Sequence, residues 1–202
     1  MRTPPGRIGR LWLLRRLEVA RRGSDVLEQK RRALRRQLER IDSELAEARS
    51  DWESSAREAE RWWQLAAILG GERSLGLART AHASPASVRV DWRNALGVVF
   101  PADVDVEVEA TDAPVGGSSA LAQAAVAYRR ALTDAAHFAA VRAAHERITA
   151  ELEATNHRLR AIERRWIPRH ERALAELELA LDEAERSEIA QVRWFRDRLR
   201  PR

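Results

Sequence analysis

Cysteine is absent from this chain of 202 residues, and lysine, methionine and tyrosine each occur once. Without cysteine, neither disulfides nor thiolate metal sites are available, which is compatible with the cytoplasm. Runs of about 18 apolar residues are also lacking, so we expect no membrane-spanning segment. The apolar stretch at 11–14 is too short for a signal-peptide core, because Arg15 and Arg16 follow it directly.

The motifs of common catalytic centres are missing as well. The sequence has no glycine-rich phosphate loop after a strand, no HExxH pair and no serine in a nucleophile elbow. Five histidines occur, but no carboxylates stand at a spacing that would complete a metal site with them. We therefore expect no catalytic residues, no metal and no cofactor, and the class of enzymes fits this chain worst.

Near the N-terminus, small or apolar residues recur at alternating steps of four and three. This average step of about 3.5 residues is typical of a coiled-coil seam, and at about 1.5 Å per residue the helix would be roughly 85 Å long. Such a helix exceeds the core of a small globular domain, which favours a rod with a mechanical or assembly role. The seam positions are Leu13, Leu17, Ala20, Ser24, Leu27, Arg31, Leu34, Leu38, Ile41, Leu45, Ala48, Trp52, Ser55, Ala59, Trp62, Ala66 and Leu69.

A second seam occupies the C-terminal part, with charged residues between its positions. Its members are Ile148, Leu152, Thr155, Leu159, Ile162, Trp166, His170, Leu174, Leu177, Leu181, Ala184, Glu188, Val192, Phe195 and Leu199. Two such stripes in one chain most simply pair as an antiparallel hairpin. With residue 13 near residue 199, equal helix lengths place residue 69 near residue 143, and residues 120–142 extend past the pair. Pro168 lies inside the second helix and predicts a kink.

Between the seams the period changes from 3.5 to 2. Gly70-Gly71 is a typical helix end, and a linker follows with one helical turn near 73–79. Valines then alternate with charged residues on either side of a turn at 94–97, which predicts a small β-hairpin or three short strands whose valines and Trp92 pack on the helices. Ser118 or Ser119 is expected to cap the second long helix. We therefore divide the chain into a coiled-coil helix at 1–70, a linker and hairpin module at 71–119, and a coiled-coil helix at 120–202.

Four acidic residues on the second strand share one face. A cation site there would need oxygens that converge on one point, which a straight strand does not supply. We favour a solvated face that pairs with Arg89 and Arg93 across the hairpin. The four residues are Asp103, Asp105, Glu107 and Glu109.

The net charge of +5 is unevenly spread along the chain. Residues 1–40 hold twelve Arg and Lys30 against four acidic residues, a net charge of +9. This basic end is compatible with a solvated helix flank, an acidic protein partner or nucleic acid. Among the seven tryptophans, those at seam positions are expected in the core, whereas Trp12, Trp63 and Trp194 are better candidates for partner contacts.

Three regions together give the chain a recognisable pattern. The first is Arg16–Gly23 continuing through Leu27 and Lys30-Arg31 to Leu34; the second is Asn94–Pro101; the third is Thr155, Arg158-Leu159, Ala161–Glu163 and Ile167-Pro168. In order and spacing, over roughly residues 5–199, the chain resembles the D-subunit of the V-type and A-type rotary ATPases. It departs from that pattern at Arg160, where asparagine is usual, and at Ile162, where leucine is usual.

The resemblance implies a central-stalk rotor that transmits rotation between a catalytic ring and a proton- or sodium-translocating membrane rotor, in ATP synthesis or hydrolysis. It implies as partners the catalytic and regulatory nucleotide-binding subunits, the small F-subunit and the membrane-proximal funnel subunit. It places the chain at the cytoplasmic face of the membrane, touching the membrane only indirectly. For the contacts with the ring at the shaft ends we expect Arg7, Arg10, Leu11, Trp12, Arg15, Trp194, Phe195, Arg198 and Leu199. For a contact through the hairpin module we expect Trp92, Val99 and Phe100.

Two other function classes stay open at this point. A basic coiled-coil scaffold would self-associate symmetrically, and a nucleic-acid-binding coiled coil would use the basic N-terminal arm with a steep dependence on salt. The sequence disfavours nucleic acid, because the arginines alternate with a hydrophobic seam and no stacking platform accompanies them.

Overall fold

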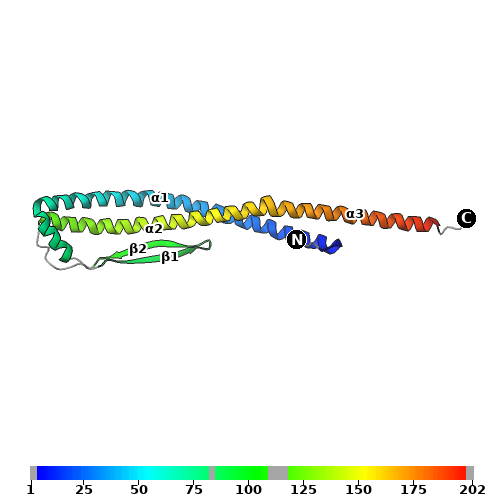
Figure 1. Cartoon of the computed structure of the whole chain (residues 1–202), viewed down its shortest axis with the longest axis horizontal. Coiled ribbons are helices and arrows are strands. Elements are labelled where there is room, and N and C mark those ends of the chain that lie inside the picture. Colours follow the sequence, from blue (N-terminus) through cyan, green and yellow to red (C-terminus); the bar gives the residue numbers. More distant parts are fainter. Residues whose placement is uncertain (1–3, 82–84, 109–117, 199–202) are drawn as a thin grey trace. The chain divides into compact units, whose positions relative to one another are not determined.

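The computed structural model describes residues 4–81, 85–108 and 118–198. It consists of two long helical segments and a β-hairpin that lies between them in the sequence. The predicted mainly α fold is confirmed (Figure 1). The elements are α1 (Gly6–Ala81), β1 (Ser87–Ala95), β2 (Val98–Glu107), α2 (Ser119–Ala161), the π-helix η1 (Ile162–Trp166) and α3 (Ile167–Arg198). They form two compact units, one of Met1–Arg32 with Glu153–Arg202 and one of Ala33–Leu152.

Both predicted seams form the cores of these units. Every seam position of α1 from Leu13 to Ala66 is buried or half-buried, and only Leu69, at 62% exposure, lies outside the core. The residues of the second seam are buried or half-buried as far as Leu181, whereas Val192 and Phe195 beyond it are exposed. Leu199 lies outside the described residues. The heptad spacing therefore identifies the core of the helix pairs but not where the pairing stops.

The predicted register between the helices is wrong. Ala66 packs against Ala120 and Leu121, not near residue 143. At the other end Arg7 contacts Glu185, so residue 13 does not face residue 199. Residues 120–142 are thus paired with α1, and the end of α3 extends past the start of α1 instead. A repeat of 3.5 residues fits equally well after a shift of seven, which is why the spacing alone cannot fix the register.

Alanines pack the second unit at its loop end. Ala59 is buried with Ala127 and Ala131. Trp62 packs against this cluster and against the cluster of Ala66, Ala120 and Leu121. Trp52 stacks on Phe138 with ring centroids 5.3 Å apart and an angle of 7° between the rings. Small residues bring the backbones close, and the broad rings fill the space on either side of them.

Gly71 interrupts α1, as the glycine pair predicts, since its φ of 69° and ψ of 170° are not helical. Helix then resumes as far as Ala81, so more of this stretch is helical than the single turn expected for a linker. At the start of α2, Ser118 occupies the predicted N-cap position, but its side chain does not cap the helix. Its carbonyl accepts the backbone N–H of Leu121 at 2.9 Å, whereas its buried hydroxyl has no hydrogen-bond partner.

The hairpin β1–β2 lies beside α2 in the second unit (Figure 1). Its two-residue turn, Leu96-Gly97, has φ angles of 57° and 79°, as in a type I′ turn. Val98 and Phe100 are buried against residues of both helices. The expectation that Trp92 packs on the helices is met only in part, because its side chain contacts Arg147 of α2 but is 55% exposed. The buried members of the cluster that faces the helices are Leu34, Ile41, Val98, Phe100, Ala144 and Ile148.

The acidic face of β2 is paired only in part. Arg89 lies 3.8 Å from both Asp105 and Glu107, which confirms its predicted cross-strand role. A bulge between Asp91 and Trp92 shifts the register, so Asp103 faces Asp91 and Arg93 faces Phe100. The predicted pairing of Arg93 with an acidic residue is therefore wrong, and Glu109 lies outside the described residues.

Pro168 follows a local change of helix type. In η1 the hydrogen bonds run from residue i to i−5, and the N–H of Ile167 bonds to the carbonyl of Ile162. Proline has no N–H, and its ring clashes with the carbonyl four residues before it in a regular α-helix. The wider π-turn accommodates the proline where the sequence predicts a kink.

None of the helices in the part of the chain that the structure describes is both long and apolar enough to cross a bilayer.

Candidate partner-binding surfaces

Ion pairs between α1 and α3 neutralise part of the basic N-terminal end. Arg7 lies 2.8 Å from Glu185, Arg10 2.7 Å from Glu178 and Arg21 2.7 Å from Glu171. All three pairs are exposed, so each contributes about 0–1 kcal/mol to stability. The two segments of this unit still carry 22 Arg and Lys against 13 Asp and Glu, a net charge of +9, whereas residues 33–152 carry −4.

The residues predicted at the shaft ends fall into two separate groups. Arg7, Arg10, Leu11 and Arg15 are exposed on the first turns of α1, and Trp12 is half-buried. Arg7 meets α3 at Glu185, nine residues before Trp194. The structure therefore does not bring Trp194 and Phe195 beside the start of α1.

The C-terminal end of α3 carries an apolar stripe with no cover from this chain among the described residues. Trp194 is 54% exposed and Phe195 58% exposed, and the two rings meet edge to face at 5.0 Å. Arg198 stacks on Trp194 at 4.5 Å from its ring centroid. Ile189 and Val192 extend the stripe towards the paired region. A stripe of this kind on a monomer is typical of a protein-binding surface.

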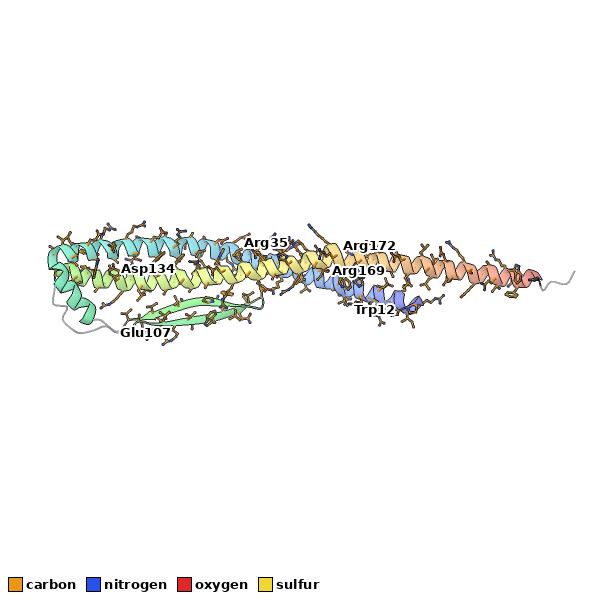
Figure 2. The ribbon with its side chains drawn as sticks, viewed as in Figure 1. Trp12, Arg35, Glu107, Asp134, Arg169 and Arg172 are labelled. Carbon is orange, nitrogen blue, oxygen red and sulfur yellow. The ribbon has the colours of Figure 1, made fainter. Side chains whose placement is uncertain are left out.

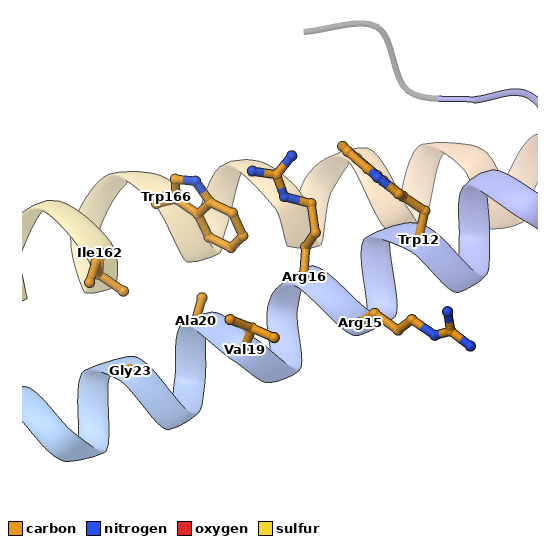
Figure 3. Close-up of a pocket in the computed structure, with 8 residues that line it drawn as sticks. All are labelled: Trp12, Arg15, Arg16, Val19, Ala20, Gly23, Ile162 and Trp166. Atoms are coloured by element: carbon orange, nitrogen blue, oxygen red, sulfur yellow. The ribbon is translucent and has the colours of Figure 1, made fainter.

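A groove of about 460 Å³ lies on the first unit, between α1 and η1. Arg16 rises from its floor between two indole rings (Figure 3), with its guanidinium carbon 4.7 Å from the Trp12 centroid and 5.5 Å from the Trp166 centroid. We call this surface the Arg16 groove. It is lined by Trp12, Arg15, Arg16, Val19, Ala20, Gly23, Ile162 and Trp166.

The π-helix and a buried histidine hold Trp166 in this groove. His170 stacks on the indole of Trp166 with ring centroids 3.7 Å apart and 19° between the rings. Its Nδ1 lies 2.8 Å from the carbonyl oxygen of Trp166, and its side chain is buried. Arg16 therefore makes cation–π contacts with both Trp12 and Trp166, and Trp166 is itself stacked on His170.

The hairpin offers two of its three predicted contact residues to solvent. Trp92 and Val99 are exposed, whereas Phe100 is 4% exposed within the core of the second unit and has no free surface for a partner. Arg147 of α2 donates a 2.9 Å hydrogen bond to the Val99 carbonyl and lies 4.9 Å from the Trp92 centroid. Together these contacts fasten the turn end of the hairpin to α2.

Clustered titratable groups and shifted pKa values among the described residues would mark a centre of chemistry. Among the described residues, no three His, Cys, Asp or Glu side chains are placed to hold a metal ion. Burial raises the pKa of Tyr128, and the nearby charge of Glu60 and the hydrogen bond that the Tyr128 hydroxyl donates to Glu60 act in the same direction. This pKa shift belongs to an exposed pair between α1 and α2.

Sequence reasoning missed Arg16 and Gly23 as surface features. The spacing of Trp12 and Arg16, one helical turn apart, was visible as an (i, i+4) pair. The second ring, from Trp166, was not predictable, because that contact depends on the register between α1 and the C-terminal helix.

Comparison with known proteins gives a consistent result along the chain. The sequence profile of the family described as the ATP synthase D-subunit matches residues 11–197. The V-type ATP synthase D-subunit from Anaeromyxobacter sp. (strain Fw109-5) is 29% identical over 206 residues, covering 100% of this chain and 95% of the relative. The A-type ATP synthase D-subunit from Methanopyrus kandleri is 29% identical, covering 96% of this chain and 85% of the relative. The V-type ATP synthase D-subunit of Thermotoga neapolitana is 25% identical, covering 98% of this chain and 99% of the relative.

Proposed function

Because the chain belongs to the family of ATP synthase D-subunits, we propose that it is the central-stalk rotor of a V- or A-type ATP synthase. Members of this family are stalk subunits and not catalytic ones, so ATP is made or hydrolysed elsewhere in the complex. The observation that carries the proposal is the match over residues 11–197, which spans both long helices and the hairpin.

The end of α3 is the surface that we assign to the ring of nucleotide-binding subunits. Trp194, Phe195 and Arg198 stand on a helix end that buries none of its apolar residues within the chain. Leu11, Trp12 and Arg15 add a second patch at the start of α1. Apolar anchors and arginines of this kind dominate the binding energy of protein interfaces.

Rotation would be driven through unequal contacts around the helix pair. A rotor that offers different side chains at different angles binds the open and closed states of the surrounding subunits with different affinity, and that difference couples their states to its rotation. In the first unit, the Arg16 groove lies on one side only and makes the surface unequal in this sense. The hairpin, with Trp92 and Val99 exposed, is the surface that we assign to the membrane-proximal funnel subunit, and we assign the small F-subunit to the side of the helix pair.

Nucleic acid fits less well as a partner, for a reason beyond composition. Arg7, Arg10 and Arg21 are paired with glutamates of α3, so a phosphate backbone would have to displace these pairs and would meet the glutamate charges beside the arginines.

Purification of the tagged chain from gently solubilised membranes at low salt tests the proposed role. The rotor predicts two large nucleotide-binding subunits, each in about threefold excess over this chain, together with the small stalk subunits of the complex. Recovery of the chain by itself, or of a symmetric oligomer of it, would contradict the proposal and favour a coiled-coil scaffold.

A further inference from the structure

The Arg16 groove combines a fixed cation with an apolar floor. Arg16 lies between two indole rings, with its guanidinium carbon 4.7 Å and 5.5 Å from their centroids, and its side chain points away from the α1 backbone (Figure 3). An arginine held in this way loses little side-chain freedom when it binds a carboxylate in a bidentate manner.

The nearby carboxylates of the chain are engaged elsewhere. Among the residues that the structure describes, Glu18 pairs with Arg22, Glu171 with Arg21, and Glu163 accepts a 2.9 Å hydrogen bond from the hydroxyl of Ser24. The contacts found for Arg16 itself are those with the two rings. Its charge is therefore available to a carboxylate from outside the chain.

Gly23 supplies an independent sign of a partner. It lies inside α1, where glycine weakens a helix relative to alanine. The fold of this chain does not require it, since a Cβ built there meets no atom within 4 Å and its φ is not in the left-handed region. A bare backbone beside an open groove allows close approach by another molecule, which is a common reason for an interior glycine.

We propose that the Arg16 groove binds an α-helix of a partner subunit, with an Asp or Glu of that helix against Arg16 and its apolar side chains over Val19, Ala20 and Gly23. The lining residues of α1 recur at 12, 15–16, 19–20 and 23, which is the spacing that a second helix complements. The unit that carries the groove has a net charge of +9, which attracts an acidic partner. The assignment to a subunit of the same complex rests on the proposed function; the chemistry of the groove does not.

Photo-crosslinking in the assembled complex tests this proposal. The full-length tagged chain carries p-benzoylphenylalanine in place of Val19, which is 69% exposed at the rim of the groove. Irradiation should link it to one segment of another subunit, and that segment should be helical and contain an Asp or Glu among apolar residues. Arg16→Gln and Gly23→Trp should each lower the yield about tenfold, whereas Arg22→Gln, an exposed arginine outside the groove, should not.

Three results would contradict helix binding by the Arg16 groove. A crosslink to another copy of this chain, to a segment without acidic residues, or with the same yield in Arg16→Gln and Gly23→Trp would overturn the proposal. Helical circular dichroism of the purified variants separates loss of docking from loss of folding, and we expect Gly23→Trp to fold because the site is open. Once the segment is known, exchanging the charges of Arg16 and its partner carboxylate should restore the yield.

The same samples separate this proposal from the proposed function. Recovery of the nucleotide-binding subunits would support the rotor role. An unchanged crosslink yield in both groove variants of that sample would contradict helix binding by the Arg16 groove. Absence of those subunits would contradict the rotor role. A crosslink in that sample to an acidic helix of another protein, dependent on Arg16, would still support helix binding by the groove.

Discussion

At the scale of single residues, the two glycines at 9 and 23 stand in the same helix for opposite reasons. A Cβ at Gly9 would collide with the carbonyl oxygen of Pro4 and lie 3.2 Å from a methyl of Leu177. Gly23 meets nothing within 4 Å. The first is required by the packing of the chain on itself, and the second is not.

Substituting alanine at each glycine tests this difference. Gly23→Ala should raise the free energy of unfolding by about 0.5–1 kcal/mol, because alanine is the better helix former and the site has room. Gly9→Ala should lower it, because Pro4 must move. Urea unfolding of the purified chain measures both, and equal effects at the two positions would contradict the close approach of Pro4 to Gly9.

Glu28 gives the first unit a specific dependence on pH. Desolvation by itself would raise the pKa of Glu28, but hydrogen bonds from Arg31 and Arg32 and their positive charges outweigh it and lower the pKa below the ordinary value of 4.5. A carboxyl group whose pKa is lower in the folded state stabilises the fold above its unfolded pKa. That contribution is lost as the pH falls through the folded value.

Comparison with Glu28→Gln over a range of pH measures this contribution. The native chain should be more stable than the variant at neutral pH, and the difference should shrink as the pH falls below 4.5. A difference that stayed constant between pH 7 and about pH 2 would mean that Glu28 makes no such pair in solution.

At the scale of elements, the sequence predicts what repeats and misses what depends on register. The heptad spacing identifies both seams, and the alternation of valines identifies the two strands. The pairing of Ala66 with Ala120 was not predictable, since a shift by one heptad preserves the apolar pattern. The same limit explains why Trp194 was expected beside the start of α1, and why the contact between Arg16 and Trp166 was missed.

The turn of the hairpin departs from the residues that such turns prefer. Leu96 has a φ of 57°, in the left-handed region where side chains other than those of Gly, Asn and Asp are disfavoured. Leu96→Asn should raise the stability of the second unit by about 0.5–1 kcal/mol, since asparagine adopts this conformation more readily. Thermal unfolding measures the effect, and destabilisation would indicate that the Leu96 side chain packs more tightly than its exposed position suggests.

The π-helix links local structure to the Arg16 groove. η1 allows Pro168 to remain within the C-terminal helix, and it carries Trp166, which contacts both Arg16 and His170. The sequence predicts that the proline interrupts regular helix. It does not predict accommodation by a single turn of wider helix, because the choice between a kink and a π-turn depends on the packing of Trp166.

At the scale of the whole molecule, charge and exposed apolar surface are distributed unequally between the two units. The unit of residues 1–32 and 153–202 has a net charge of +9 and carries the apolar end of α3 together with the Arg16 groove. Exposed arginines such as Arg169 and Arg172 add to its charge (Figure 2). The unit of residues 33–152 has a net charge of −4 and carries the hairpin. Family membership and this distribution together favour a rotor whose two units meet different partners.

A reversible link between α3 and its surroundings tests the rotor directly. Because the chain has no cysteine, Val192→Cys introduces a unique thiol on the exposed end of α3, to which a photo-reactive group with a reducible disulfide is attached. In the purified complex, irradiation should join this chain to a nucleotide-binding subunit and abolish ATP hydrolysis in proportion to the fraction linked. Reduction of the disulfide should restore hydrolysis. Full activity in the linked complex would contradict a rotating role for this chain.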